Sequence, residues 1–182
     1  CRKICMSCSD KIGFKPCPLC RARVPRGEPE ALALLRRHVD AEIPDALTHL
    51  GSMYREGKLG LVKSAKKAAK LYKRAVELGN LQAMVSLGMV YEIGYGGAKM
   101  DKKKARQLFQ MASDGGNAIA HFNLGNHLSR EGQMEEAFRL YKMAAEHGLT
   151  PAEFNVGLSN EKGVGVERDV DEAKRWYARA AA

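Results

Sequence analysis

Residues 44–80 read PDALTHLGSMYREGKLGLVKSAKKAAKLYKRAVELGN, and residues 81–117 read LQAMVSLGMVYEIGYGGAKMDKKKARQLFQMASDGGN. The second stretch carries the pattern of the first, shifted by 37 positions. The motif Ala-x3-Leu-Gly-x2-Tyr begins at Ala46 and returns at Ala83. Self-similarity at a fixed period of this length is the signature of a repeat architecture, in which each unit buries its apolar face against the next.

Two motifs, separated by a loop, make up every copy. The first motif returns in weaker form at Ala120 and Ala152, and the second, Ala-x2-Leu/Trp-aromatic-x2-Ala, begins at Ala68, Ala105, Ala137 and Ala173. Apolar spacings of three and four predict amphipathic helices, so each copy is expected to form a helical hairpin. The copies are residues 44–80, 81–117, 118–149 and 150–182, and the third is shorter because its loop lacks five residues.

Glycines occupy two fixed places in this pattern. Gly79, Gly116 and Gly148 end three of the copies, where a helix needs a left-handed C-terminal residue. The motif glycines, which let the paired helix approach closely, are Gly51, Gly88, Gly125 and Gly157. The sequence therefore predicts an all-α protein: an α-solenoid of about four helical hairpins. Residues 29–41 are expected to form one more helix that caps the N-terminal end of the array.

The fourth copy resembles a known repeat. Its stretch Gly163-Val164-Gly165-Val166-x2-Asp169-x3-Ala173-x2-Trp176-Tyr177-x2-Ala180-Ala181 is similar to the Sel-1-like repeat, a relative of the tetratricopeptide repeat with a longer inter-helix loop. The resemblance covers residues 44–182. It departs from the family pattern in the first loop, in the shortened third loop and at Asn160, where an aromatic residue is usual. The resemblance implies a scaffold that binds other proteins and performs no chemistry of its own.

The tetratricopeptide geometry would place the first helix of each hairpin along a concave groove. The residues three before and one after the motif glycine would then face that groove; in the last three copies they are Val85, Met89, Phe122, Asn126, Phe154 and Leu158. We expect the apolar members to form a docking stripe for a peptide or a helix. The alternative is that they are ordinary packing residues of the core.

The net charge of +9 could suggest nucleic-acid binding, because lysines crowd residues 63–74 and 99–106. The aromatic residues of those helices lie at core spacing, however, whereas nucleic-acid surfaces pair basic charge with exposed aromatic rings. A solvated helix face accounts better for the lysines. No nucleophile elbow, phosphate-binding loop or HExxH motif is present, and no apolar run approaches the roughly 20 residues of a membrane span.

Five cysteines all lie within the first 20 residues: Cys1, Cys5, Cys8, Cys17 and Cys20. The last four form two C-x2-C pairs, and each pair can direct two thiolates onto one Zn²⁺. An odd, tightly clustered set is a poor disulfide framework and a good metal-site pattern. Zinc is therefore the expected cofactor, either in a functional finger or as a purely structural staple. Metal-bound thiolates need a reducing compartment, so a cytoplasmic or nuclear location is expected.

The stretch Cys17-Pro18-Leu19-Cys20-Arg21 resembles the end of a RING finger, the module that recruits ubiquitin-conjugating enzymes. The resemblance implies that the five cysteines are the fourth to eighth ligands of a two-zinc cross-brace, with the others upstream of Cys1. It also implies that Pro18 contacts the conjugating enzyme, and that Arg21 bridges that enzyme and ubiquitin. A RING positions a thioester and performs no covalent catalysis.

These observations predict three segments. Residues 1–24 would be a partial RING-type zinc finger with incomplete sites, residues 25–43 a hinge and capping helix, and residues 44–182 the repeat solenoid. The expected function is the substrate-binding part of a RING-type ubiquitin ligase. The alternative is a non-enzymatic adaptor with a vestigial or structural zinc head.

Overall fold

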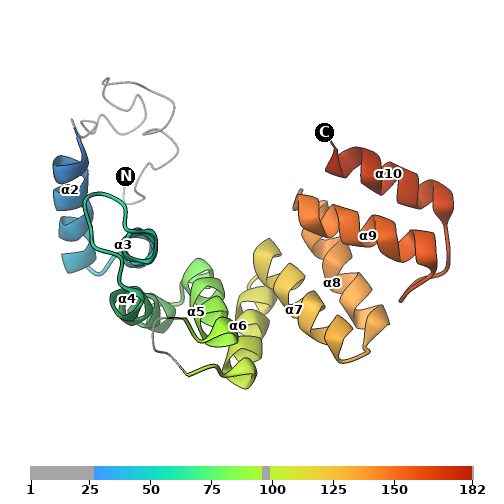
Figure 1. The fold of residues 1–182 in the computed structure, drawn as a ribbon, viewed down its shortest axis with the longest axis horizontal. Helices are drawn as coiled ribbons and strands as arrows, with labels where there is room; N and C mark the ends of the chain where they lie inside the picture. Colours follow the sequence, from blue (N-terminus) through green and yellow to red (C-terminus); the bar gives the residue numbers. More distant parts are fainter. Residues whose placement is uncertain (1–26, 96–98, 182) are drawn as a thin grey trace. The chain divides into compact units, whose positions relative to one another are not determined.

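The computed structural model describes residues 27–95 and 99–181, and apart from 3-10 backbone at Tyr95 the regular elements in these ranges are α-helices (Figure 1). The helical hairpins expected from the two motifs are observed. The helices are α2 (Glu28–Asp40), α3 (Pro44–Glu56), α4 (Ala65–Glu77), α5 (Leu81–Ile93), α6 (Lys102–Asp114), α7 (Ala118–Arg130), α8 (Met134–Glu146), α9 (Thr150–Lys162) and α10 (Val170–Ala180). From α3 onward, each odd-numbered helix carries the first motif, and the even-numbered helix that follows carries the second.

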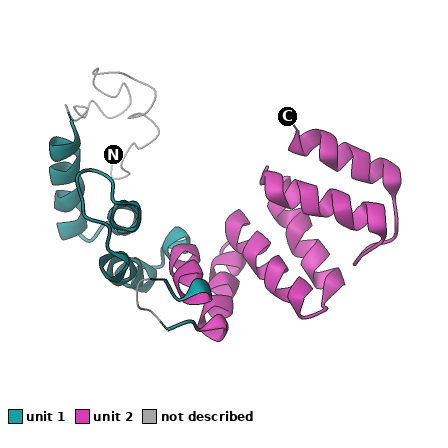
Figure 2. Ribbon diagram, in the orientation of Figure 1, with its two compact units in different colours: residues 1–83, 93–100 teal, residues 84–92, 101–182 magenta. Residues whose placement is uncertain are grey.

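The chain forms two compact units (Figure 2). The first consists of residues 1–83 and 93–100, and the second of residues 84–92 and 101–182. In the first unit, Leu35 of α2 packs against Ala46 and Leu50 of α3, so the helix expected over residues 29–41 does cover the first hairpin. The second unit contains the groove-facing residues expected from the repeat pattern.

Close contact between a glycine and an aromatic ring joins the two helices of each hairpin. A Cβ atom added to Gly88 would lie 2.6 Å from Cε1 of Phe109, which is fully buried. Distances this short do not occur between carbon atoms that are not bonded, so only glycine fits. The same contact occurs in all four hairpins, in the pairs Gly51–Tyr72, Gly88–Phe109, Gly125–Tyr141 and Gly157–Tyr177. The close helix approach predicted from the motif glycines is confirmed.

Glycine also ends the second helix of the first three hairpins. Gly79, Gly116 and Gly148 have φ values of 78°, 82° and 77°, in the left-handed region. After α6, the Gly116 N–H donates to the Ser113 carbonyl, and the Asn117 N–H donates to the Ala112 carbonyl. These two bonds form a Schellman motif, which satisfies the last carbonyls of the helix and turns the chain into the next repeat.

One backbone hydrogen bond closes every inter-helix loop, whatever the loop length. The N-cap residue of the second helix donates its N–H to a carbonyl near the end of the first helix; the pairs are Ser64–Tyr54, Asp101–Tyr91, Gln133–Leu128 and Asp169–Asn160. The four bonds measure 2.8, 2.9, 2.9 and 2.9 Å. The side chains of Ser64, Asp101 and Asp169 each cap the N-terminus of the second helix. In the shortened third loop, the side chain of Gln133 makes no such hydrogen bond. The shortened loop therefore changes the connection and keeps its anchor.

Candidate protein-binding surface

The first helices of the last three hairpins, α5, α7 and α9, carry the six groove-facing residues expected from the sequence. All six belong to the second unit. Met89 is 43% exposed and Phe154 is 52% exposed, whereas Val85 is only 1% exposed. Phe122, Asn126 and Leu158 are half-buried. Val85 is therefore a core residue. Of the six predicted groove residues, the other five are accessible at least in part.

The two phenylalanines make the same contact one repeat apart. Phe122 lies 5.8 Å from the ring of Tyr141, and Phe154 lies 5.5 Å from the ring of Tyr177, measured between ring centroids. The rings are tilted by 49° and 45°, an arrangement typical of favourable aromatic pairs. Each phenylalanine therefore packs against the tyrosine of its own hairpin. Phe154 still keeps half of its surface open to a partner.

Asn126 is fixed in this surface by a hydrogen bond. The Tyr141 hydroxyl donates to Oδ1 of Asn126 at 2.9 Å. Burial raises the pKa of Tyr141 above its ordinary value, so the hydroxyl stays protonated and remains a donor. Ser52 lies 3.2 Å from the Tyr72 hydroxyl at the equivalent position of the first hairpin. In the first and third hairpins, the residue after the motif glycine therefore contacts the tyrosine hydroxyl of the second helix.

Two polar residues buried in the second unit were not among the expected site residues. The residue four before the motif glycine is buried in every copy: Leu47, Met84, His121 and Glu153. Nδ1 of His121 lies 2.7 Å from the Ser113 hydroxyl, and the Glu153 carboxylate lies 3.1 Å from the Arg179 guanidinium. The apolar character of this position in the first two copies is the sequence signal that could have identified both residues as buried.

His127 is another buried polar residue, two positions after the motif glycine of α7. Its Nε2 lies 3.4 Å from a Glu92 carboxylate oxygen but makes no hydrogen bond, and its ring packs 5.7 Å from that of Phe109. Burial lowers the pKa of His127 below 6.5, and the charge of Glu92 opposes this only partly. Burial, assisted by the charge of His147, also lowers the pKa of His121.

Because His121 and His127 have lowered pKa values, we expect the protein to lose stability in mild acid. In the unfolded chain each imidazole becomes protonated near pH 6.5. In the folded chain the lowered pKa keeps each imidazole neutral to lower pH. The free energy of unfolding is thus at its full value above about pH 6.5 and falls as the pH drops below that value. Thermal unfolding between about pH 8 and pH 5 measures the slope.

His127→Val, which copies Val90 of the preceding hairpin, should flatten this pH dependence. An equal slope in the protein and in His127→Val would contradict the assignment.

An open pocket of about 890 Å³ lies beside the shortened third loop. Its lining comes from residues 132–136, 138, 139, 163 and 165–167, and none of the expected groove residues takes part. The described part of the chain contains no group of three or more His, Cys, Asp or Glu side chains arranged to hold a metal ion. The expected zinc ligands, and with them Pro18 and Arg21, lie outside the described residues. Among the described helices, none has the length and apolar character needed to cross a membrane.

A comparison with known protein families matches the Sel1 repeat to four stretches of this chain, residues 44–80, 81–117, 118–149 and 150–182. The chain therefore belongs to the Sel1 repeat family, and the predicted α-solenoid class and the Sel-1-like resemblance are confirmed. Sel1 repeat proteins act as scaffolds for protein–protein interactions. No curated protein matches the chain.

Two solved structures support the same classification. The chain is similar to a Sel1 repeat protein from Oxalobacter formigenes, with a TM-score of 0.76 and 31% identity over 85% of this chain and 64% of that one. It is also similar to a protective antigen of uropathogenic Escherichia coli that displays an SLR fold, with a TM-score of 0.76 and 27% identity over 84% of this chain. The chain spans only 33% of that antigen. MamA, at 22% identity and a TM-score of 0.52, shares the fold.

Proposed function

We propose that this chain is a protein-binding scaffold whose partner contacts Met89, Phe122, Asn126, Phe154 and Leu158 on the first helices of the second unit. The observation that carries the proposal is the exposure of Phe154, which leaves 52% of a large apolar side chain in water. Exposed aromatic side chains are unfavourable in water and are enriched at protein interfaces. Asn126, held by Tyr141, adds a fixed polar group beside the apolar residues. This combination suits a peptide or helix that offers apolar side chains and a few hydrogen-bonding groups.

Phe154→Ser tests this surface. We expect binding to peptides selected on the unaltered protein to weaken at least about tenfold, because central aromatic anchors dominate interface energies. Stability should fall by only about 1 kcal/mol, the value of the aromatic pair with Tyr177. Binding is measured by fluorescence anisotropy and stability by thermal unfolding.

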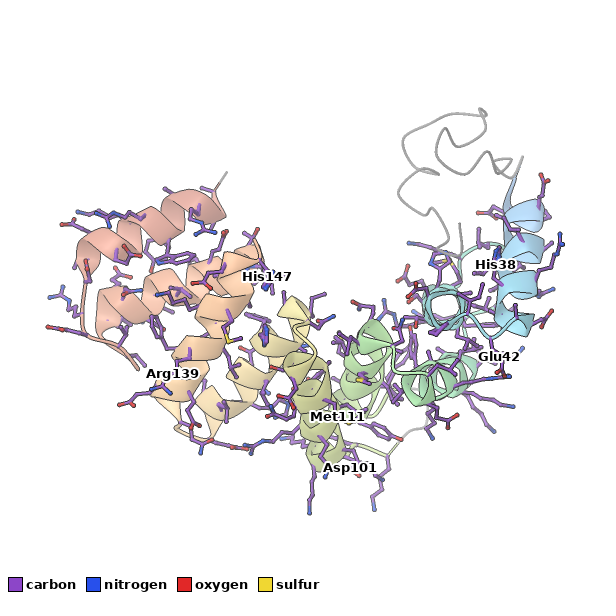
Figure 3. The ribbon with its side chains drawn as sticks, turned by 180° about the vertical axis from the view of Figure 1, so that it is seen from behind. His38, Glu42, Asp101, Met111, Arg139 and His147 are labelled. Carbon is purple, nitrogen blue, oxygen red and sulfur yellow. The ribbon has the colours of Figure 1, made fainter. Side chains whose placement is uncertain are left out.

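The matched control is Met111→Ser on α6, a second-motif helix, because Met111 is 51% exposed but lies outside the surface (labelled in Figure 3). It should leave binding unchanged. If Phe154→Ser instead unfolds the protein, the residue belongs to the core; if a folded variant binds normally, the surface is elsewhere. Phe122→Ser repeats the test one hairpin earlier.

A second candidate function rests on the cysteine spacing at the N-terminus. We propose that Cys1, Cys5, Cys8, Cys17 and Cys20 belong to a RING-type zinc module, with Pro18 and Arg21 contacting a ubiquitin-conjugating enzyme. The repeats would then hold the substrate of a ubiquitin ligase. The two C-x2-C pairs and the fifth cysteine support a zinc module of this kind. An adaptor without ligase activity fits the repeat fold equally well.

Autoubiquitination by the full-length gene product distinguishes the two. A ligase loses activity completely in Cys17→Ser, because the zinc site is broken, and is strongly impaired in Arg21→Ala. An inactive full-length protein favours the adaptor.

For the 182-residue chain itself we expect weak zinc binding or none, and one tightly held zinc per chain in metal analysis would contradict that expectation.

A further inference from the structure

One exposed helix face in the first unit has a charge pattern unlike that of its structural equivalents. Lys66, Lys70 and Lys73 of α4 follow one another at spacings of four and three, so they lie on the same side of the helix. All three are exposed, and none forms an ion pair with any residue that the structure describes. Glu77 is the single acid in the same row, at its C-terminal end.

The other hairpins provide an internal comparison, because their second helices present the same register to solvent. In α8 the equivalent row is Glu135, Arg139, Lys142 and Glu146, in which opposite charges lie four residues apart at both ends (Arg139 is labelled in Figure 3). The equivalent row of α6 is Lys103, Gln107, Gln110 and Asp114, and that of α10 begins Asp171, Arg175, Ala178. A row that only needs to be solvated therefore has mixed or neutral composition in this protein. The row on α4 instead has three lysines in succession before its single acid, Glu77.

This pattern costs α4 stability in two ways. Lysines three and four residues apart repel each other along a helix. Lys66 also lies in the first turn, where the helix dipole disfavours positive charge, and α4 has no acidic residue in that turn. The first turn of α6 also lacks an acid, whereas α8 and α10 both carry two acids there. A negatively charged partner would relieve both effects.

Two neighbouring basic side chains of α4 are already engaged, so within this helix the unpaired positive charge is confined to the row. Arg74 pairs with Glu42, and the ammonium of Lys67 lies 5.1 Å from the ring centre of Tyr54. Tyr72 is fully buried, so no aromatic ring of α4 is available to stack on a base. Val62, in the loop before α4, is 85% exposed and is an apolar side chain open to a partner. These features favour a polypeptide over a nucleic acid.

We propose that the α4 lysine face (Lys66, Lys70 and Lys73) docks an acidic segment of a partner protein. This surface is separate from the groove residues of the second unit and does not depend on them. The interaction is electrostatic, so it weakens as the salt concentration rises.

The test compares two double charge reversals at equivalent positions. Lys66→Glu with Lys70→Glu alters the α4 lysine face, and Arg139→Glu with Lys142→Glu alters α8 while changing the net charge by the same amount. The probe is a fluorescent oligoglutamate peptide, titrated by anisotropy at low and physiological ionic strength. We expect the α4 variant to bind it at least about tenfold more weakly, and the α8 variant to bind it like the unaltered protein.

Thermal unfolding adds a second readout. The α4 variant should melt at a higher temperature, because it turns the repulsion between residues 70 and 73 into attraction and places an acid in the first turn. The α8 variant should melt lower, because four acids then share one row. Equal loss of binding in both variants would show a general charge effect and overturn the proposal. So would a single-stranded oligonucleotide or phosphatidylserine vesicles that bind in an α4-dependent way while oligoglutamate does not.

Discussion

Replacing Gly88 with alanine is expected to destabilise the protein by about 1–3 kcal/mol, the usual cost of forcing extra volume into a packed core. The new methyl group would lie 2.6 Å from Cε1 and 3.0 Å from two further carbons of Phe109. Phe109 cannot move aside without disturbing the core, because it is fully buried. The better helix propensity of alanine recovers part of the loss. The melting temperature should fall by roughly 2–12 °C in a circular dichroism melt.

Gly157→Ala is the matched control for this prediction. The added methyl would meet Tyr177 at a similar 2.7 Å, but Tyr177 is only half-buried, and its hydroxyl donates to Glu161 at the surface. The ring can swing outward, so we expect a much smaller change. A second check is Gly88→Ala combined with Phe109→Leu, which makes room and should cost less than the sum of the single changes. Equal effects of alanine at Gly88 and at Gly157 would contradict the role assigned to ring burial.

Arg179→Met is expected to cost about 2 kcal/mol, because it leaves the buried Glu153 carboxylate without its partner. The side chain of Glu153 is only 7% exposed and lies 3.1 Å from the guanidinium. Arg179 also donates to the Ala145 carbonyl and lies over the Trp176 ring, 4.3 Å from its centre. The expected cost is below that of a fully buried pair because Arg179 is half exposed and Glu153 lies in the first turn of α9.

The double variant Glu153→Met with Arg179→Met tests the cause. Met84 occupies the position of Glu153 in an earlier hairpin, so methionine suits this place in the repeat. We expect the double variant to recover most of the lost stability in chemical denaturation. Arg175→Met, which removes an exposed ion pair with Glu172, should have little effect. If Arg179→Met is harmless, or if the double variant is no better, the loss does not come from the stranded carboxylate.

The repeat pattern predicts hairpins, helix-ending glycines and a close helix approach at the motif glycines, because each depends on spacing along the chain. It does not predict exposure at equivalent positions. Val85 and Phe154 share a register, yet one is buried and the other half open. Register sets the direction of a side chain from its own helix, whereas burial depends on the neighbouring helices that cover it. Comparison across the copies does identify buried polar residues. Leu47 and Met84 show that the position four before the motif glycine is apolar in the first two copies, and His121 and Glu153 occupy the same buried position in the last two.

The hydrogen bond that closes each loop has a consequence for how such proteins can change. In the third hairpin five residues are missing, yet the Gln133 N–H still reaches the Leu128 carbonyl as its counterparts do. The helix ends are held by this anchor, so the intervening segment can vary in length at a small entropic cost. These loops are natural sites for inserting a tag, a reporter or a new recognition sequence while the hairpin beneath keeps its packing.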